Sequence, residues 1–129
     1  MSAHVHESTF GLALERALNA PGRLTRVVRV NAGTFVKRDE RGRAVGAVRG
    51  APAGTADLVG IAGPTGLYLE IELKADGGRV RPAQRARAAT VRRLGGVYLV
   101  VEYDDEAPLA TNLGRGVCAV DTAIAGARL

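Results

Sequence analysis

The sequence predicts one α/β domain in which a mixed β-sheet is flanked by helices. Residues 67–74, LYLEIELK, alternate apolar and polar side chains, which is typical of a strand with one buried face. Residues 7–20 and 82–94 carry apolar side chains at helical spacing, which indicates one amphipathic helix before this strand in the chain and one after it. A chain of 129 residues can bury one sizeable core but not two, so we assign residues 1–129 to a single domain.

The first half of the chain predicts a helix followed by strands. The helix covers residues 7–20, where the apolar positions share one side. Residues 23–30 are rich in valine and arginine and predict a strand, and residues 34–37 predict the strand that pairs with it. The charged residues 38–43 are expected to form a hairpin tip, from which residues 44–49 continue as a further strand.

The middle of the chain predicts a β-hairpin and then a helix. Residues 56–61 and 67–74 have strand patterns, and the turn-forming sequence AGPTG between them indicates antiparallel pairing. Pro82 suits the first turn of a helix, which runs to about Leu94 and is ended by two glycines. The residues expected on its inward face are Gln84, Ala88, Val91 and, less centrally, Leu94.

The last part of the chain predicts one more strand and short helices. Residues 97–101, VYLVV, suit a central strand buried on both faces, and the preceding helix favours a parallel crossover. Residues 102–106 are acidic and are expected to form a loop. The remainder predicts two short helical pieces interrupted by residues 114–116, GRG, with Cys118 as a small buried side chain.

The charge of the chain favours a polyanionic partner. The net charge is +5, and all basic residues except Lys37 and Lys74 are arginines, which bind phosphate with a bidentate fork. A coding bias toward arginine and alanine explains the same composition equally well. Aromatic residues make up only 4% of the chain, which argues against a base-stacking platform for single strands.

The cysteine content indicates a reducing compartment. Cys118 is the only cysteine, so no intrachain disulfide can form, and no cluster has zinc-ligand spacing. We therefore expect a cytoplasmic protein. No stretch has the length or unbroken apolarity of a membrane span, so no membrane partner is expected.

The predicted hairpin brings two acidic residues together. Asp57 lies near the start of one strand and Glu72 near the end of the other, so their side chains should lie side by side. Carboxylate oxygens suit a hard cation. Lys74 points to the same face as Glu72, where it can offset negative charge on a phosphate. Glutamate and lysine also occur on solvent-exposed strand faces, so Glu72-x-Lys74 alone is weak evidence.

Gln84 is the polar residue on the inward face of the second helix. An amide left there without partners costs about 1–3 kcal/mol, so a polar group should lie opposite it. The available candidates are Lys74 and the two carboxylates.

These residues carry a family resemblance. The pattern Gly54-x-x-Asp57, then Glu72-x-Lys74, then residues 78–84, GRVRPAQ, resembles the VRR-NUC branch of the PD-(D/E)XK nucleases. The resemblance implies a restriction-endonuclease-like fold, a sandwich with a central mixed sheet flanked by helices. It also implies cleavage of DNA that depends on Mg²⁺ or Mn²⁺, in a bacterial or phage-type setting.

The resemblance assigns roles to the motif residues. Asp57, Glu72 and the backbone carbonyl of Leu73 would hold the metal ion. Lys74 would orient the attacking water or help to deprotonate it, and Gln84 would fix Lys74.

Further positions are compared with the same family pattern. Glu7 corresponds to a glutamate early in the first helix and is a candidate third acidic ligand, although it equally suits the positive end of the helix dipole. Asn31 is a candidate phosphate contact or, alternatively, a turn residue. Proline usually precedes the aspartate in this family, and Ala56 stands there instead. We expect a looser turn with the chemistry retained.

Arginines gather in and just before the second predicted helix. Four of them are expected to contact the DNA backbone: Arg79, Arg81, Arg85 and Arg92. A solvated helix face is the alternative for these residues.

The sequence thus predicts a structure-selective DNA endonuclease. The resemblance implies branched DNA as substrate, including four-way (Holliday) junctions, and paired cuts on such a junction need a homodimer. We expect the dimer interface in the first helix and the strand before Asn31. The alternatives are a sequence-specific, restriction-like endonuclease on duplex DNA and a non-catalytic basic DNA-binding module of the same fold.

Overall fold

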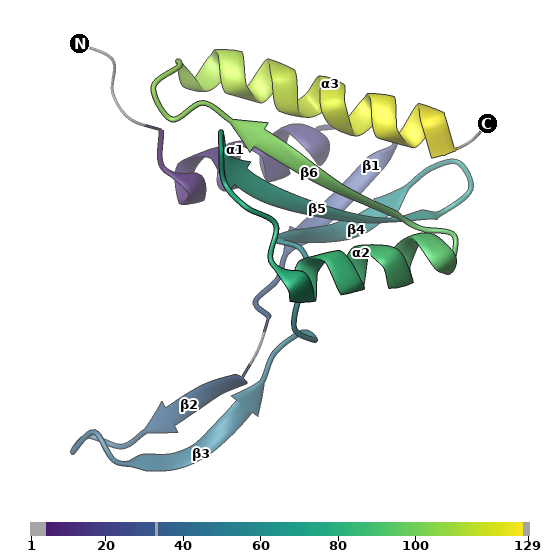
Figure 1. Cartoon of the computed structure of the whole chain (residues 1–129). Helices are drawn as coiled ribbons and strands as arrows, with labels where there is room; N and C mark the ends of the chain where they lie inside the picture. The colour runs from purple at the N-terminus through teal and green to yellow at the C-terminus, as the bar shows by residue number, and fades with distance from the viewer. Residues whose placement is uncertain (1–4, 33, 128–129) are drawn as a thin grey trace.

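The computed structural model describes residues 5–32 and 34–127. Figure 1 shows an α/β domain from which one β-hairpin projects. The elements in chain order are α1 (Glu7–Leu18), β1 (Thr25–Arg29), β2 (Thr34–Arg38), β3 (Ala44–Arg49), β4 (Leu58–Ala62), β5 (Leu67–Ala75), α2 (Pro82–Arg93), β6 (Val97–Tyr103) and α3 (Leu109–Ala127).

A mixed sheet in the order β1-β4-β5-β6 forms the centre of the domain. β4 pairs antiparallel with both β1 and β5, whereas β5 and β6 run parallel and are joined through α2. The predicted α/β class, the mixed sheet, the β4–β5 hairpin and the parallel crossover are therefore confirmed. The prediction that β6 is a central strand is wrong, because it lies at the sheet edge and owes its burial to helices on both of its faces.

Helices cover both faces of the sheet (Figure 1). α1 and α3 pack together on one face, and α2 lies on the other face against β6. The alternation in β5 directs Leu69, Ile71 and Leu73 into the core beneath α1 and α3, where each is at most 2% exposed. The α1 residues buried in this core are Phe10, Gly11, Leu14 and Leu18.

The inward face of α2 agrees with the prediction except at its last position. The helix begins at Pro82, and Ala88 and Val91 are buried in a second, smaller apolar cluster. Leu94 is 78% exposed. It is the C-terminal capping residue, where the chain already leaves the helix, so helical periodicity no longer determines its direction.

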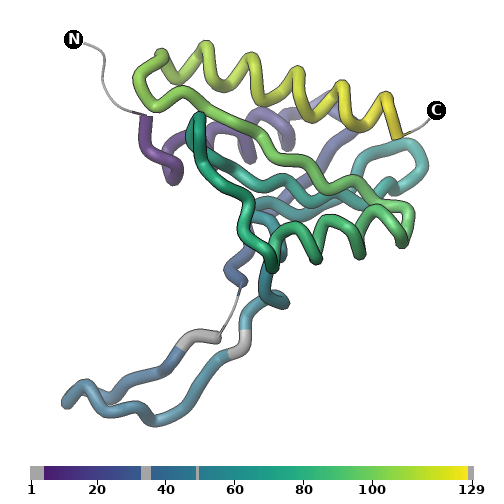
Figure 2. Tube along the Cα trace, viewed as in Figure 1, coloured from purple at the N-terminus to yellow at the C-terminus, as the bar shows by residue number. Residues whose placement is uncertain are grey.

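The strand at residues 34–38 does not pair with β1, which corrects the prediction from sequence. β2 pairs with β3 in a separate two-stranded sheet, and the charged residues between them form its tip, as expected. We call residues 34–49 the arm. Figure 2 shows that the arm extends away from the rest of the domain. β1 pairs instead with β4, which joins it to the buried sheet rather than to a solvated hairpin.

A single helix, α3, replaces the two short pieces that the glycines suggested. A Cβ atom at Gly116 would lie 3.2 Å from Phe10 and 3.3 Å from Leu14, so this glycine permits close packing of α3 on α1. Cys118 is exposed rather than buried, because it lies two residues beyond the buried stripe that contains Gly116. Neither α3 nor any other described helix combines the length and apolarity of a membrane span.

The apolar face of α1 is used within the chain, where α1 packs on α3, β1 and β5. The dimer interface expected on this helix is therefore not available there. Exposed apolar side chains remain on the sheet, where Val28 is 57% and Ile61 is 53% exposed. Strand register places Val28 opposite Val59 and Val59 opposite Glu70, so Val28 and Val59 are on the same sheet face as Glu70. α2 covers this face at the β6 side of the sheet.

Candidate active site

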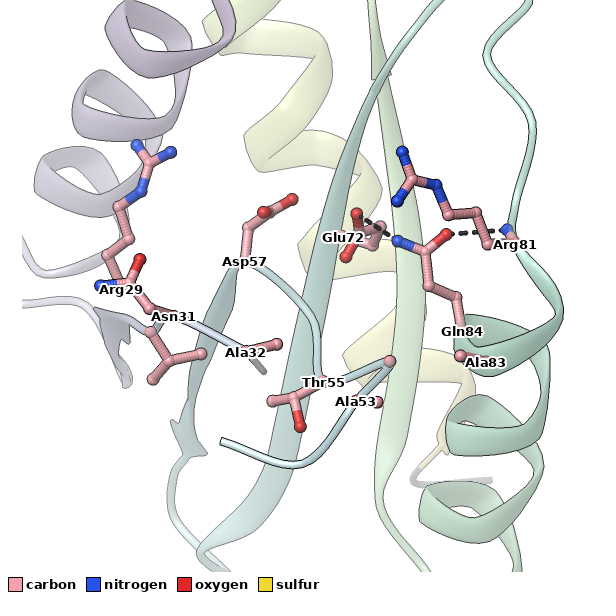
Figure 3. Close-up of a pocket in the computed structure, with 12 residues that line it drawn as sticks. Arg29, Asn31, Ala32, Ala53, Thr55, Asp57, Glu72, Arg81, Ala83 and Gln84 are labelled. Carbon is pink, nitrogen blue, oxygen red and sulfur yellow. Dashed lines mark hydrogen bonds between the residues drawn. The ribbon is translucent and has the colours of Figure 1, made fainter. Parts of the chain in front are cut away.

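A pocket of about 540 Å³ opens where the end of β5, the start of α2 and the residues before β4 meet the base of the arm (Figure 3). The charged and amide side chains that line it are Asp57, Glu72, Arg29, Arg81, Asn31 and Gln84. The structure thus gathers residues that are far apart in the sequence, and all of these except Arg29 were candidates from sequence.

Asp57 and Glu72 lie side by side, as the hairpin predicted. The register pairs Leu58 with Ile71, which places Asp57 opposite Glu72 just beyond the end of the β4 ladder. Asp57 Oδ2 accepts a hydrogen bond of 2.8 Å from the backbone N–H of Leu73. This bond holds the aspartate carboxylate against the β5 backbone beside the glutamate.

The carboxyl of Glu72 is held in an environment that disfavours its negative charge. Burial and the neighbouring Asp57 carboxylate raise the pKa of Glu72 to about 7, and the charge of Glu7 adds to this, whereas the charge of Lys74 acts in the opposite direction. A bound cation would relieve the repulsion between the two carboxylates. This pair of hard oxygen donors fits Mg²⁺ or Mn²⁺.

The backbone carbonyl of Leu73 can complete the donor set. In a strand, the N–H and C=O of one residue point toward the same neighbouring strand. Since the Leu73 N–H points to Asp57, the Leu73 carbonyl is directed to the same side of β5. It lies beyond Leu58, the first residue of β4 that pairs with β5. The arrangement therefore offers two carboxylates and one carbonyl oxygen where the start of β4 meets the end of β5.

Glu7 is not part of this donor set. Its side chain is exposed at the start of α1, and among residues 5–32 and 34–127 no three His, Cys, Asp or Glu side chains gather closely enough to hold an ion. The third-ligand role predicted for Glu7 is therefore absent from this geometry. Its charge still acts on the pKa of Glu72, so the first helix does approach the site.

Lys74 and Gln84 both contact Glu72. Lys74 Nζ lies 3.7 Å from Glu72 Oε1, and Gln84 Nε2 donates a hydrogen bond of 2.9 Å to the same oxygen. Gln84 Oε1 accepts from the backbone N–H of Arg81 at 2.9 Å. The expected polar partner of Gln84 is thus found. The prediction that Gln84 fixes Lys74 is corrected, because its amide bridges Glu72 and the start of α2.

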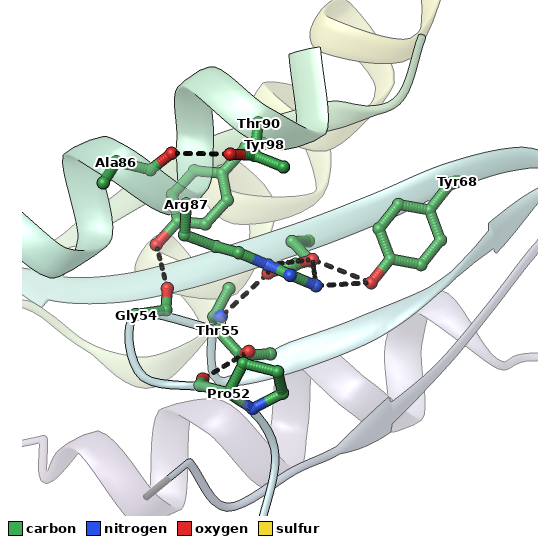
Figure 4. Close-up of polar contacts among 10 residues, drawn as sticks. Pro52, Gly54, Thr55, Tyr68, Ala86, Arg87, Thr90 and Tyr98 are labelled. Atoms are coloured by element: carbon green, nitrogen blue, oxygen red, sulfur yellow. Dashed lines mark hydrogen bonds and ion pairs between the residues drawn. The ribbon is translucent and has the colours of Figure 1, made fainter. Parts of the chain in front are cut away.

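A second carboxylate on the same face of β5, Glu70, is fully buried and forms a network that sequence reasoning missed. Its partners Arg87 and Tyr68 are labelled in Figure 4. Its partners are Arg87 Nη2 at 2.7 Å, the Tyr68 hydroxyl at 2.7 Å and the backbone N–H of Ala56 at 3.1 Å. Burial alone raises the pKa of the Glu70 carboxyl, but these hydrogen bonds outweigh it and the pKa is lowered. Glu70 therefore stays ionised.

The Glu70 network restrains the backbone next to the site. The hydrogen bond from Ala56 holds the residue that directly precedes Asp57. Proline has no N–H and could not make this bond. This bond opposes the loosening of the turn that is expected where Ala56 stands in place of proline. The signal in the sequence was the spacing of Gln84 and Arg87, which share a helix face and so can both reach the polar face of β5.

Gly54 and Tyr98 hold the loop before β4 against α2. Gly54 has a φ of +84°, and a Cβ atom there would collide with the backbone carbonyl of Ala83. The Tyr98 hydroxyl donates a hydrogen bond of 3.2 Å to the Gly54 carbonyl, and burial raises the pKa of Tyr98, so it remains a donor. Sequence reasoning had placed Tyr98 only within an apolar strand.

The four arginines predicted to contact DNA are all exposed, but they do not all lie at the pocket. Arg81 lines the pocket, whereas Arg79 and Arg85 do not. Arg92, at the other end of the helix, donates a hydrogen bond of 2.9 Å to the carbonyl of Tyr98. Arg29, which was not among the predicted contacts, lines the pocket from β1. The basic residues that line the pocket with the carboxylates are therefore Arg29 and Arg81.

No protein-family model matches the chain, and no curated protein matches it. The fold and site define the class by themselves: an α/β domain with a central mixed sheet, and an acidic pair, a lysine and a glutamine gathered where the inner strands β4 and β5 meet the start of α2.

Proposed function

We propose that this protein is a metal-dependent DNA endonuclease of the PD-(D/E)XK type. The observation that carries the proposal is the convergence of Asp57 and Glu72 at the end of a β-hairpin, with Lys74 Nζ 3.7 Å from Glu72 Oε1. The α/β architecture supports it, since the site lies at the ends of the two inner strands of a mixed sheet that is flanked by helices.

The donor oxygens fit a hard divalent cation. Asp57, Glu72 and the Leu73 carbonyl would hold Mg²⁺ or Mn²⁺, and such an ion, when bound, makes water a stronger nucleophile and neutralises charge on the scissile phosphate. The hydrogen bond from Leu73 N–H holds Asp57 in place for this role, and the bond from Gln84 does so for Glu72.

The other residues of the site act on the phosphate and on water. Lys74 is close enough to Glu72 to position a water molecule beside it and to offset the negative charge that develops during attack. Arg29 and Arg81, on opposite sides of the pocket in Figure 3, supply positive charge for the flanking phosphates. Because these contacts reach phosphates rather than bases, we propose selection by DNA structure, with branched DNA as the preferred substrate.

The test is cleavage of labelled linear, flap, splayed and four-way DNA in Mg²⁺, Mn²⁺ and EDTA. We expect cleavage in either metal and none in EDTA. Lys74→Ala should lose about 10²–10³-fold in cleavage rate, with DNA binding within a few-fold of wild type, because this charge acts mainly in the transition state. Asp57→Asn should lose cleavage together with metal binding.

The matched control is Asp76→Asn, which makes the same chemical change at an exposed carboxylate outside the pocket. It should leave both cleavage and metal binding unchanged. Unimpaired cleavage by Lys74→Ala would remove the proposed mechanism. Metal-independent binding without cleavage would indicate a binding module, and cleavage only at one short duplex sequence would indicate a restriction-like enzyme.

A further inference from the structure

The arm, residues 34–49, is a two-stranded ribbon whose side chains at 36–48 lie at the surface. Its strands pair from Phe35 with Val48 to Arg38 with Ala44, and none of residues 36–48 belongs to either buried apolar cluster. Val36 is 52% and Val45 is 62% exposed. A two-stranded hairpin alone in water is marginally stable, so a ribbon of this kind gains stability when something covers it.

The charge of the arm indicates a polyanion as the occupant. Residues 34–49 contain five basic and two acidic residues, a net charge of +3 out of +5 for the whole chain. Asp39 is already used in the turn, where its carboxylate accepts hydrogen bonds of 2.9 Å from the N–H groups of Arg41 and Arg43. Lys37 and the Arg41 guanidinium make no hydrogen bond or ion pair with the described residues, so their charges are available to a partner.

The arm emerges directly from the candidate active site. Asn31 and Ala32 lead into it and Ala53 follows it, and all three line the pocket with Asp57 and Glu72. A bond of 2.8 Å from the Ala51 N–H to the Asn31 carbonyl closes its base. A DNA strand that places one phosphate at the two carboxylates therefore passes beside the base of the arm.

The dimensions of the arm match a duplex groove. The major groove of B-form DNA admits a two-stranded β-ribbon. The longer strand, β3, has six residues, and at about 3.3 Å per residue it spans about 20 Å. This length corresponds to about six base pairs at about 3.4 Å each.

We propose that the arm lies in the major groove of duplex DNA on one side of the scissile phosphate, with Lys37 and Arg41 on the phosphates. The exposed valines then face the groove walls instead of water. This inference rests on the proposed function in that the partner is DNA, and it adds where the duplex runs and which element reads its groove.

The first test compares two double variants of equal net charge. Lys37→Ala with Arg41→Ala neutralises the arm, and Arg16→Ala with Arg115→Ala neutralises exposed positions on α1 and α3. Binding to duplex and to four-way DNA is measured by fluorescence anisotropy in EDTA over a range of salt. The arm variant should lower the salt slope by about two units, one for each lost phosphate contact, and the control variant should not change it.

Hydroxyl-radical footprinting tests the position. The wild type should protect about six base pairs on one side of the cleavage position, and the arm variant should lose this protection. Folding is checked by circular dichroism and thermal unfolding, which should match wild type because Lys37 and Arg41 are both exposed. An unchanged salt slope in the arm variant, or an equal loss in the control, would overturn the proposal.

Replacement of residues 34–49 by a short Gly-Ser linker separates DNA binding from self-association. If this variant changes the oligomeric state while the salt slope per subunit stays that of wild type, the arm is an interface between copies and the proposal fails. Because binding is measured without metal, an arm-dependent footprint stands even if the protein cleaves nothing. Conversely, metal-dependent cleavage without an arm footprint leaves the nuclease proposal intact.

Discussion

Glu70 and Glu72 lie two residues apart on the same face of β5, but their carboxyl groups have opposite pKa shifts. Hydrogen bonds from Arg87, Tyr68 and Ala56 outweigh burial and lower the pKa of Glu70. Burial and Asp57 raise the pKa of Glu72. Opposite shifts in neighbouring carboxylates distinguish a group that holds structure together from one that is available for a cation.

Glu72 should make the metal-free protein less stable as the pH rises. Its pKa is about 7 in the fold, whereas a glutamate in water has a pKa of 4.5, so between these values the unfolded chain loses the proton first and folding becomes less favourable. We expect Glu72→Gln to remove this dependence and to raise the stability of the metal-free protein near pH 8 by about 1–3 kcal/mol. Thermal unfolding in EDTA across this range measures the effect.

Added metal provides the control for this experiment. Mg²⁺ or Mn²⁺ should stabilise the wild type at high pH through binding to the folded state, and Glu72→Gln should gain little. If the stability of Glu72→Gln follows the same pH curve as the wild type, Glu72 does not titrate between its two pKa values of 4.5 and about 7.

Glu70 should matter more to stability than its neighbour Tyr68. Glu70→Gln removes the charge paired with Arg87 and should cost about 2–4 kcal/mol, less than for a fully buried pair because Arg87 is 25% exposed. Tyr68→Phe removes the neutral hydrogen bond to the same carboxylate and a longer one of 3.5 Å from Arg87 Nη2, and it should cost about 0.5–1.5 kcal/mol. Urea unfolding at neutral pH gives both values, and equal losses would contradict this division.

At the scale of elements, helix α3 shows how packing overrides a local signal. Glycines weaken an isolated helix, yet α3 continues through both Gly114 and Gly116. A Cβ atom at Gly116 would lie 3.2–3.5 Å from Phe10, Leu14 and Val101, whereas a Cβ atom at Gly114 would meet nothing within 4 Å. The two glycines therefore have different reasons to be present.

Alanine at these two positions separates helix propensity from packing. Gly114→Ala should stabilise the protein by up to about 1 kcal/mol, because it adds helix propensity in open space. Gly116→Ala gains the same propensity but presses on buried side chains, so it should be less stable than Gly114→Ala by about 1–3 kcal/mol. Denaturant unfolding of both variants measures the difference. Equal stabilities would show that the core yields to a methyl group without cost.

At the scale of the whole molecule, two symmetric cuts on a four-way junction need two active sites, so we expect a homodimer. We place its interface on the exposed sheet face around Val28 and Ile61. Light scattering at micromolar protein should give twice the chain mass. Ile61→Asp should produce a monomer, whereas Leu12→Asp, at an exposed leucine on α1 and therefore on the opposite side of the sheet, should not.

Junction cleavage extends this prediction. The dimer should cut opposing strands in pairs, and the Ile61→Asp monomer should nick each junction once. A wild-type monomer that nicks flaps and junctions equally well would exclude junction resolution and leave the nuclease proposal standing.

The sequence by itself determined the local features of the site. Strict alternation in residues 67–74 and the turn before them place Asp57 beside Glu72, and helical spacing turns Gln84 inward. Both results follow from side-chain periodicity and turn chemistry within a few residues, so they do not depend on segments far away in the chain.

Tertiary structure decided the partners. Three choices depend on which segments cover which face of the sheet. They are the pairing of β1 with β4 rather than β2, the burial of Glu70, and the contact of Gln84 with Glu72 rather than Lys74. Each alternative satisfies the same local pattern. They differ in apolar burial and hydrogen bonding between segments far apart in the chain, so the choice is made only when the whole core assembles.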